Sequence, residues 1–99
     1  MSALFVYVKL GVRGRLNPET QKCVGRIFKQ CYRPRGLNLM ITSICEGTHD
    51  SGSLHYCGDA VDFQGQDVPL DEIARAAGAG FDVVPSMAGT VHAEWDPKP

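Results

Sequence analysis

Residues 37–63 read LNLMITSICEGTHDSGSLHYCGDAVDF, and this stretch predicts the centre of the fold. Leu37 to Cys45 is rich in apolar and β-branched residues and predicts a central strand. Glu46 to Tyr56 is dense in Gly, Ser, His and Asp, which is typical of a loop. Gly58 to Phe63 predicts a second, short strand. We therefore expect two neighbouring strands joined by a polar loop.

Upstream of this stretch, the sequence predicts one strand and one helix. Ala3 to Lys9 (ALFVYVK) is apolar and β-prone, so we expect a strand there. Asn17 is a helix-capping residue type, and Pro18 follows at the position where a helix tolerates proline best. Apolar residues then recur at helical spacing: Val24, Ile27, Phe28 and Cys31. Pro34 and Gly36 end the predicted helix.

Downstream, the pattern predicts a second helix and a hairpin. The helix begins at Pro69 and stops at Gly78 or Gly80. Phe81–Val84 and Thr90–Trp95 are predicted to be paired strands. The order β-α-β-β-α-β-β indicates an α+β domain, with two helices packed on a small, mainly antiparallel sheet.

Length and composition favour a single domain spanning residues 1–99. The chain has 43% apolar and 21% charged residues, as globular domains do, and its apolar runs are too short to cross a membrane. No signal peptide is recognisable, so we expect synthesis in a bacterial or host cytoplasm. The chain has four cysteines and no CxxC motif. Cys23 and Cys31 lie eight residues apart on the predicted helix and are expected in the core, whereas Cys45 and Cys57 flank the loop; the disulfide state of the four stays open.

Charge is distributed unevenly along the chain. Residues 1–40 carry eight basic residues and one acidic residue, whereas residues 41–99 carry two basic and ten acidic residues. One interpretation is that the two halves neutralise each other in the fold. The other is that the basic half meets an acidic partner. No nucleic-acid-binding motif accompanies the basic residues, so specific nucleic-acid binding is not expected.

Three residues of this chain have the chemistry of a zinc site. Zinc prefers His nitrogen, Cys sulfur and carboxylate oxygen, and a catalytic site keeps three protein ligands and one open position. His55 at the loop exit, Asp62 on the following strand and His92 on the last strand supply that set. The alternative is a surface histidine, a turn-capping aspartate and a hydrogen-bonded strand histidine. A rival, closed site uses Cys45, His49, His55 and Cys57, although this spacing fits no familiar zinc finger.

Ser53 to Phe63 (SLHYCGDAVDF) resembles the signature S-x-H-x-x-G-x-A-x-D. That signature belongs to the superfamily of D-alanyl-D-alanine carboxypeptidases and dipeptidases, phage endolysin peptidases and the Hedgehog signalling domain. Ile41 to Ser43 resembles the segment before the superfamily's metal loop, and Val91 to Trp95 (VHAEW) resembles its final metal strand. The resemblance implies Zn²⁺ held by His55, Asp62 and His92 with a water as fourth ligand. Ser53 would support the ligands from outside the coordination shell.

The resemblance also implies hydrolysis of peptide bonds in peptidoglycan, for which members use a glutamate as general base. That glutamate lies three or six residues before the last metal histidine, where this chain has Gly89 and Ser86. An accessory histidine of the family is replaced by Thr90. Glu94 is the candidate replacement base, because it follows His92 by two residues and shares its face of a strand.

These departures favour a catalytically silent, zinc-binding structural or binding module, for example in a virion. The resemblance, which includes phage endolysins, implies synthesis in a bacterial cytoplasm followed by incorporation in a virion or release at lysis. The alternative is an active zinc peptidase that hydrolyses peptidoglycan stem peptides, of the endolysin or D-Ala-D-Ala carboxypeptidase type. The expected partner is accordingly a peptidoglycan peptide or an acidic protein neighbour in a virion or cell wall.

Overall fold

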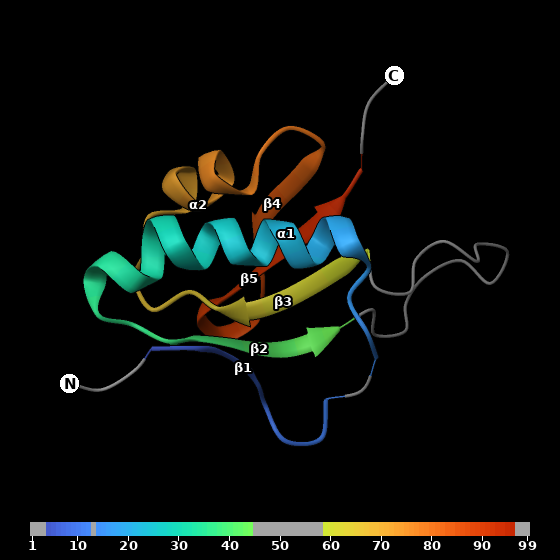
Figure 1. Ribbon diagram of the computed structural model, residues 1–99, viewed down its shortest axis with the longest axis horizontal. Helices are drawn as coiled ribbons and strands as arrows, with labels where there is room; N and C mark the ends of the chain where they lie inside the picture. The colour runs from blue at the N-terminus through green and yellow to red at the C-terminus, as the bar shows by residue number, and fades with distance from the viewer. Residues whose placement is uncertain (1–3, 13, 45–58, 97–99) are drawn as a thin grey trace, which may run out of the picture.

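Five strands form one sheet in the order β1-β2-β3-β5-β4 in the computed structural model, which describes residues 4–12, 14–44 and 59–96 (Figure 1). The β1–β2 pair is parallel, and every other pair is antiparallel. The strands are β1 (Val6–Val8), β2 (Leu39–Ile44), β3 (Ala60–Gln64), β4 (Phe81–Pro85) and β5 (Thr90–Trp95). The helices α1 (Pro18–Ile27) and α2 (Leu70–Ala77) pack on one side of this sheet. The predicted α+β class is confirmed.

Helix α1 begins where its sequence predicts. The side chain of Asn17 accepts a hydrogen bond from the backbone N–H of Thr20 at 2.7 Å, and Pro18 is the first helical residue. Beyond Ile27 the chain continues as a π-helical turn (Phe28–Tyr32) and a 3-10 turn (Arg33–Arg35). Pro34 has no N–H for the regular helical bond, and Gly36 then ends the segment at φ 72°.

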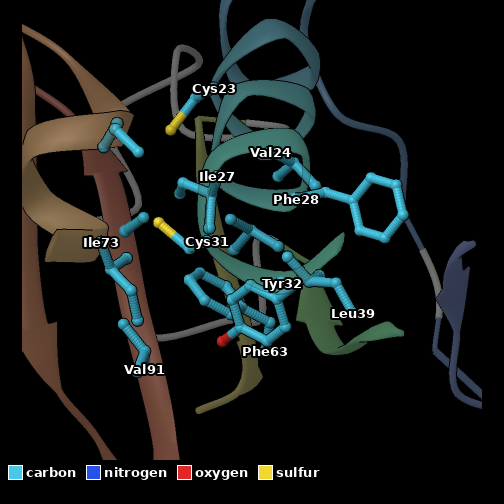
Figure 2. Close-up of a cluster of buried hydrophobic side chains, with 14 of the residues drawn as sticks. Cys23, Val24, Ile27, Phe28, Cys31, Tyr32, Leu39, Phe63, Ile73 and Val91 are labelled. Atoms are coloured by element: carbon cyan, nitrogen blue, oxygen red, sulfur yellow. The ribbon is translucent and has the colours of Figure 1, made fainter. Parts of the chain in front are cut away.

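The core lies between α1, α2 and the inner face of the sheet (Figure 2). Cys23 and Cys31 are buried in it, as predicted, and burial raises the pKa of Cys23 to about 11. Tyr32 packs edge-on against Phe63, with ring centroids 6.2 Å apart. Its hydroxyl donates to the carbonyl of Gln64 at 2.7 Å, so the one polar atom of this large buried side chain is satisfied.

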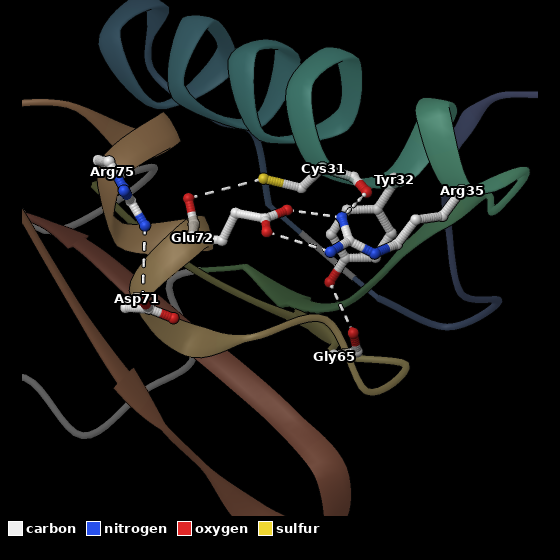
Figure 3. A network of polar contacts seen from close by, with 7 residues as sticks. All are labelled: Cys31, Tyr32, Arg35, Gly65, Asp71, Glu72 and Arg75. Carbon is white, nitrogen blue, oxygen red and sulfur yellow. Dashed lines mark hydrogen bonds and ion pairs between the residues drawn. The ribbon is translucent and has the colours of Figure 1, made fainter.

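Two arginines fasten α2 to the α1 segment. Arg26 donates to the carbonyls of Ala76 (3.2 Å) and Ala77 (2.6 Å), which lie at the end of α2 where carbonyls lack helical partners. Arg35 binds both carboxylate oxygens of Glu72, at 2.6 and 3.1 Å (Figure 3). These contacts fix α2 over β4 and so hold the sheet that carries the candidate site.

Four strands differ in their bounds from the prediction. β1 covers Val6–Val8 where the sequence predicts a strand over residues 3–9, and β2 begins at Leu39, two residues after its predicted start. β3 covers Ala60–Gln64 where residues 58–63 were predicted, and β4 extends to Pro85, one residue beyond the prediction. Among the described residues β1 pairs with β2 alone, so little holds its ends in the sheet. The hairpin of β4 and β5 and the stop of α2 at Gly78 are as predicted. Within the described ranges, no helix has the length and apolarity needed to span a membrane.

Candidate metal centre

Asp62 on β3 lies directly opposite His92 on β5 in an antiparallel pair. Their neighbours Val61, Phe63 and Val91 are buried against the helices. Side chains alternate between the two faces of a strand, so Asp62 and His92 share the sheet face that α1 and α2 leave uncovered. Their side chains remain 28% and 29% exposed, respectively.

Both ring nitrogens of His92 contact a carboxylate. Nδ1 lies 2.6 Å from Oδ1 of Asp62, and Nε2 lies 3.1 Å from Oε1 of Glu94. A protonated imidazole donates from both nitrogens, and a carboxylate oxygen on each side accepts, so the two contacts fix the ring from both sides. Glu94 therefore shares the strand face of His92, as its spacing predicts, and is occupied in orienting the ring.

The two carboxylates set the protonation of His92. Burial alone lowers the pKa of the imidazole, since it disfavours the charged form. The hydrogen bonds to Asp62 and Glu94, together with their negative charges, outweigh burial and raise the pKa above its usual value. The two carboxylates thus favour the positively charged form of the ring.

A β-bulge adjoins the site. The β2–β3 register shifts between Ile41 and Ser43, which leaves Thr42 as the extra residue and places Ser43 opposite Asp62. Bulges re-aim side chains and are common beside functional sites. The sequence pattern predicted only that Ser43 precedes the loop. It did not predict that Ser43 lies opposite Asp62, because a shift in strand register leaves no periodic pattern in the sequence.

A second contact that the sequence did not predict holds the start of β3. The side-chain amide of Asn17, which also caps α1, donates to Asp59. Asp59 comes directly before β3, so this contact ties the N-terminal end of α1 to the strand that carries Asp62.

The donors in this pair suit zinc. Two ligands with bonds of about 2.0–2.1 Å in a tetrahedral shell lie about 3.4 Å apart. Asp62 Oδ1 and His92 Nδ1, at 2.6 Å, would therefore separate by less than 1 Å to share an ion. Across residues 4–12, 14–44 and 59–96, no group of three His, Cys, Asp or Glu side chains is placed to hold a metal. The third ligand that a zinc site requires would lie outside these residues.

The remaining predicted site residues lie outside the described part of the chain. His55 and Ser53 fall there, as do all four members of the rival set: Cys45, His49, His55 and Cys57. The structure therefore brings together two of the three predicted ligands, Asp62 and His92.

The turn before β5 has no carboxylate at the two positions where the sequence resemblance implies a general base. Ser86 and Gly89 are exposed residues of the β4–β5 connection, and Gly89 adopts φ 81°. Thr90, at the accessory-histidine position, donates its hydroxyl to the carbonyl of Met87 at 2.6 Å. Thr90 thus closes the turn with its hydroxyl.

Comparison with known proteins gives no match: no family model fits the chain, and no curated protein or solved structure matches it.

Proposed function

We propose that this chain is a zinc-binding domain of the Hedgehog and D-Ala-D-Ala peptidase type, acting as a structural or binding module. The observation that carries the proposal is the pairing of Asp62 and His92 across β3 and β5. In this proposal His55 is the third ligand and Ser53 supports the ligands, as the sequence resemblance implies. A bound ion would tie residue 55 to two strands of a small domain, and domains of this size gain much of their stability from such links.

Each residue of the described pair has a defined task in this proposal. His92 presents Nδ1 to Asp62, so these two atoms are the ones that would hold the ion. Nε2 keeps its proton and donates to Glu94, which fixes the tautomer and the angle of the ring. Glu94 is then a positioning residue, and its conservative replacement should leave the ligand set intact.

One observation supports a second candidate, an active zinc peptidase acting on peptidoglycan stem peptides. Glu94 is a carboxylate on the same face as His92 and within 3.1 Å of its ring, so it could take a proton from a nearby water. Zinc would supply an acidified water and polarise the substrate carbonyl. The silent module is favoured because Glu94 is already bound to His92, while Ser86 and Gly89 carry no base.

The two candidate functions imply different partners. A peptidoglycan peptide suits the peptidase, whereas an acidic protein neighbour in a phage particle or cell wall suits the module. The basic residues of the first 40 positions support the second partner.

A metal analysis paired with a peptidoglycan digest tests both candidates. Purified protein is analysed for metal by mass spectrometry and then incubated with peptidoglycan, whose fragments are identified by mass. One zinc per chain without new peptide termini supports the module. One zinc with new termini establishes the peptidase, and Glu94→Gln then tests the base. Absence of zinc after incubation with excess Zn²⁺ overturns both candidates.

A further inference from the structure

A row of cations follows the exposed side of α1 and of the two turns that continue it. Lys22 and Lys29 are seven residues apart, which is two helical turns or about 10 Å along the axis, and Arg33 follows about one turn later. All three side chains are exposed. Cys23 and Ile27 point from the other side of the helix into the core (Figure 2). The three cations therefore face away from the sheet.

No carboxylate of the described chain neutralises this row. Across residues 4–12, 14–44 and 59–96, no ion pair includes any of the three cations. Arg26 and Arg35, on the same segment, are bound to α2 and do not belong to the row. Glu19, in the first turn of α1, is the one acidic residue between positions 18 and 35. The row therefore presents positive charge that attracts an anion.

A glycine lies within the row. Gly25 follows Lys22 by three residues and precedes Lys29 by four, so the three positions share one face of the helix. A Cβ at Gly25 would meet no atom within 4 Å, so packing does not require glycine there. Glycine inside a helix is less favourable than alanine, but its missing side chain leaves the backbone open between two ammonium groups. We call Lys22, Gly25, Lys29 and Arg33 the α1 ridge; an anionic group can approach it closely at the glycine.

The α1 ridge lacks the side chains that several kinds of anionic partner would need. Protein interfaces are centred on apolar and aromatic anchors, and helices that lie on membranes insert apolar side chains. The exposed large apolar side chains of the described chain lie elsewhere: Phe5, Tyr7, Val8, Leu10, Val84 and Met87. Phe28 and Tyr32, the aromatic residues of the α1 segment, are buried, so neither ring can stack on a base of a single strand. Charge without apolar anchors suits the phosphates of a nucleic-acid duplex.

We propose that the α1 ridge binds the phosphate backbone of double-stranded DNA without sequence preference. Lys22 and Lys29 contact phosphates on either side of Gly25, where the DNA backbone lies against the helix, and Arg33 contacts a third phosphate. Contacts to phosphates position a protein on DNA but carry no sequence information. The ridge and the candidate metal centre lie on opposite sides of the sheet, so the inference does not depend on zinc or on the proposed function.

The salt dependence of DNA binding tests the proposal. Fluorescence anisotropy with a labelled DNA duplex measures the affinity between about 50 and 200 mM salt. Three neutralised phosphates should lower the affinity about 40-fold over this range, because each adds roughly −0.9 to the slope of log affinity against log salt. Lys29→Gln removes one contact and should reduce this loss to about 12-fold. Lys9→Gln is the matched control, since Lys9 is an exposed lysine beyond the end of β1; it should behave like the parent.

Gly25→Ala tests the close approach of the DNA backbone. Alanine is the better helix former, so this variant should unfold at a higher temperature than the parent. It should nevertheless lose affinity for the duplex, because its methyl group lies between the phosphates and the helix. Two duplexes of different sequence should bind the parent equally, whereas a single strand or polyglutamate should bind it less tightly than either duplex.

Several outcomes overturn the inference. These are no binding of the duplex at about 50 mM salt, an unchanged salt dependence in Lys29→Gln, or a Gly25→Ala protein that binds the duplex like the parent. Tighter binding of polyglutamate than of the duplex would assign the α1 ridge to an acidic protein instead. None of these results depends on the metal content of the protein, which tests the proposed function separately.

Discussion

His92 and Asp62 lie opposite each other on neighbouring strands, and Nδ1 of the one is 2.6 Å from Oδ1 of the other. The two residues are 30 positions apart in the chain and meet only because β5 inserts between β3 and β4. Glu94 completes the arrangement by holding Nε2 of the same ring. Because these residues lie together on one face of the sheet, they form a candidate site.

Asp62→Asn should greatly weaken zinc binding, because an amide oxygen replaces a charged ligand at nearly the same size. The loss should exceed the roughly 10–100-fold that removal of an outer-shell partner causes. Competition with a zinc-sensitive dye measures the affinity. Asp67→Asn is the control, since Asp67 is exposed at φ 61°, a conformation that Asn also adopts. Equal affinity in both variants would remove Asp62 from the ligand set.

Glu94→Gln distinguishes a positioning residue from a base. The amide oxygen of Gln can still accept from Nε2 of His92, so zinc content should be retained and affinity should fall by no more than about 10–100-fold. If the protein hydrolyses peptidoglycan, loss of that activity with zinc still bound identifies Glu94 as the base. Hydrolysis that survives in the zinc-loaded variant excludes that role.

Local sequence patterns were sufficient to predict most of the fold. The Asn17–Pro18 start, the apolar spacing of α1 and the glycine stop after α2 are short-range signals, and the structure confirms them. The length of β1 was not predictable, because it depends on pairing with a single distant neighbour. The candidate site likewise combines residues that local spacing predicts with residues that only the strand order brings together. Spacing put Glu94 on the face of His92, but strand order brought Asp62 to that ring, and a bulge set Ser43 opposite it.

Gly80→Ala should destabilise the protein more than Gly36→Ala. Both glycines have positive φ, so each alanine incurs a backbone cost of about 1–2 kcal/mol. A Cβ at Gly36 meets open space, whereas one at Gly80 would lie 2.6 Å from Cζ3 of Trp95, which packs against Phe81. The clash should add roughly 1–3 kcal/mol.

Urea unfolding measures this difference. Trp95 is the one tryptophan of the chain, so its fluorescence should shift in folded Gly80→Ala and remain unchanged in Gly36→Ala. Equal losses of unfolding free energy in Gly80→Ala and Gly36→Ala would show that Trp95 does not occupy the described position.

The ion pair of Glu72 with Arg35 should make stability depend on acid pH. Its hydrogen bonds to Arg35 hold the pKa of Glu72 below its usual value of 4.5 in the folded protein. A lowered folded pKa stabilises the protein above the unfolded pKa, and this contribution is lost as pH falls through the folded value. Glu72→Gln should therefore have a lower free energy of unfolding than the parent at neutral pH. This difference in unfolding free energy should become smaller toward pH 3.

Urea midpoints at several pH values measure that gap. Asp71→Asn is the control, because the Arg75–Asp71 contact is 3.4 Å long and largely exposed. A gap between parent and Glu72→Gln that stays constant with pH contradicts the described pair.

Nitrogen NMR of the three histidines during a zinc titration tests the central claim most directly. The account predicts that zinc shifts the Nδ1 resonance of His92, leaves its Nε2 protonated against Glu94, and also shifts His55. His49 serves as the internal reference and should not respond, and Asp62→Asn should abolish the change at His92. Zinc binding that leaves His92 unchanged and shifts His49 and His55 together would place the metal on the rival cysteine–histidine set and contradict the account.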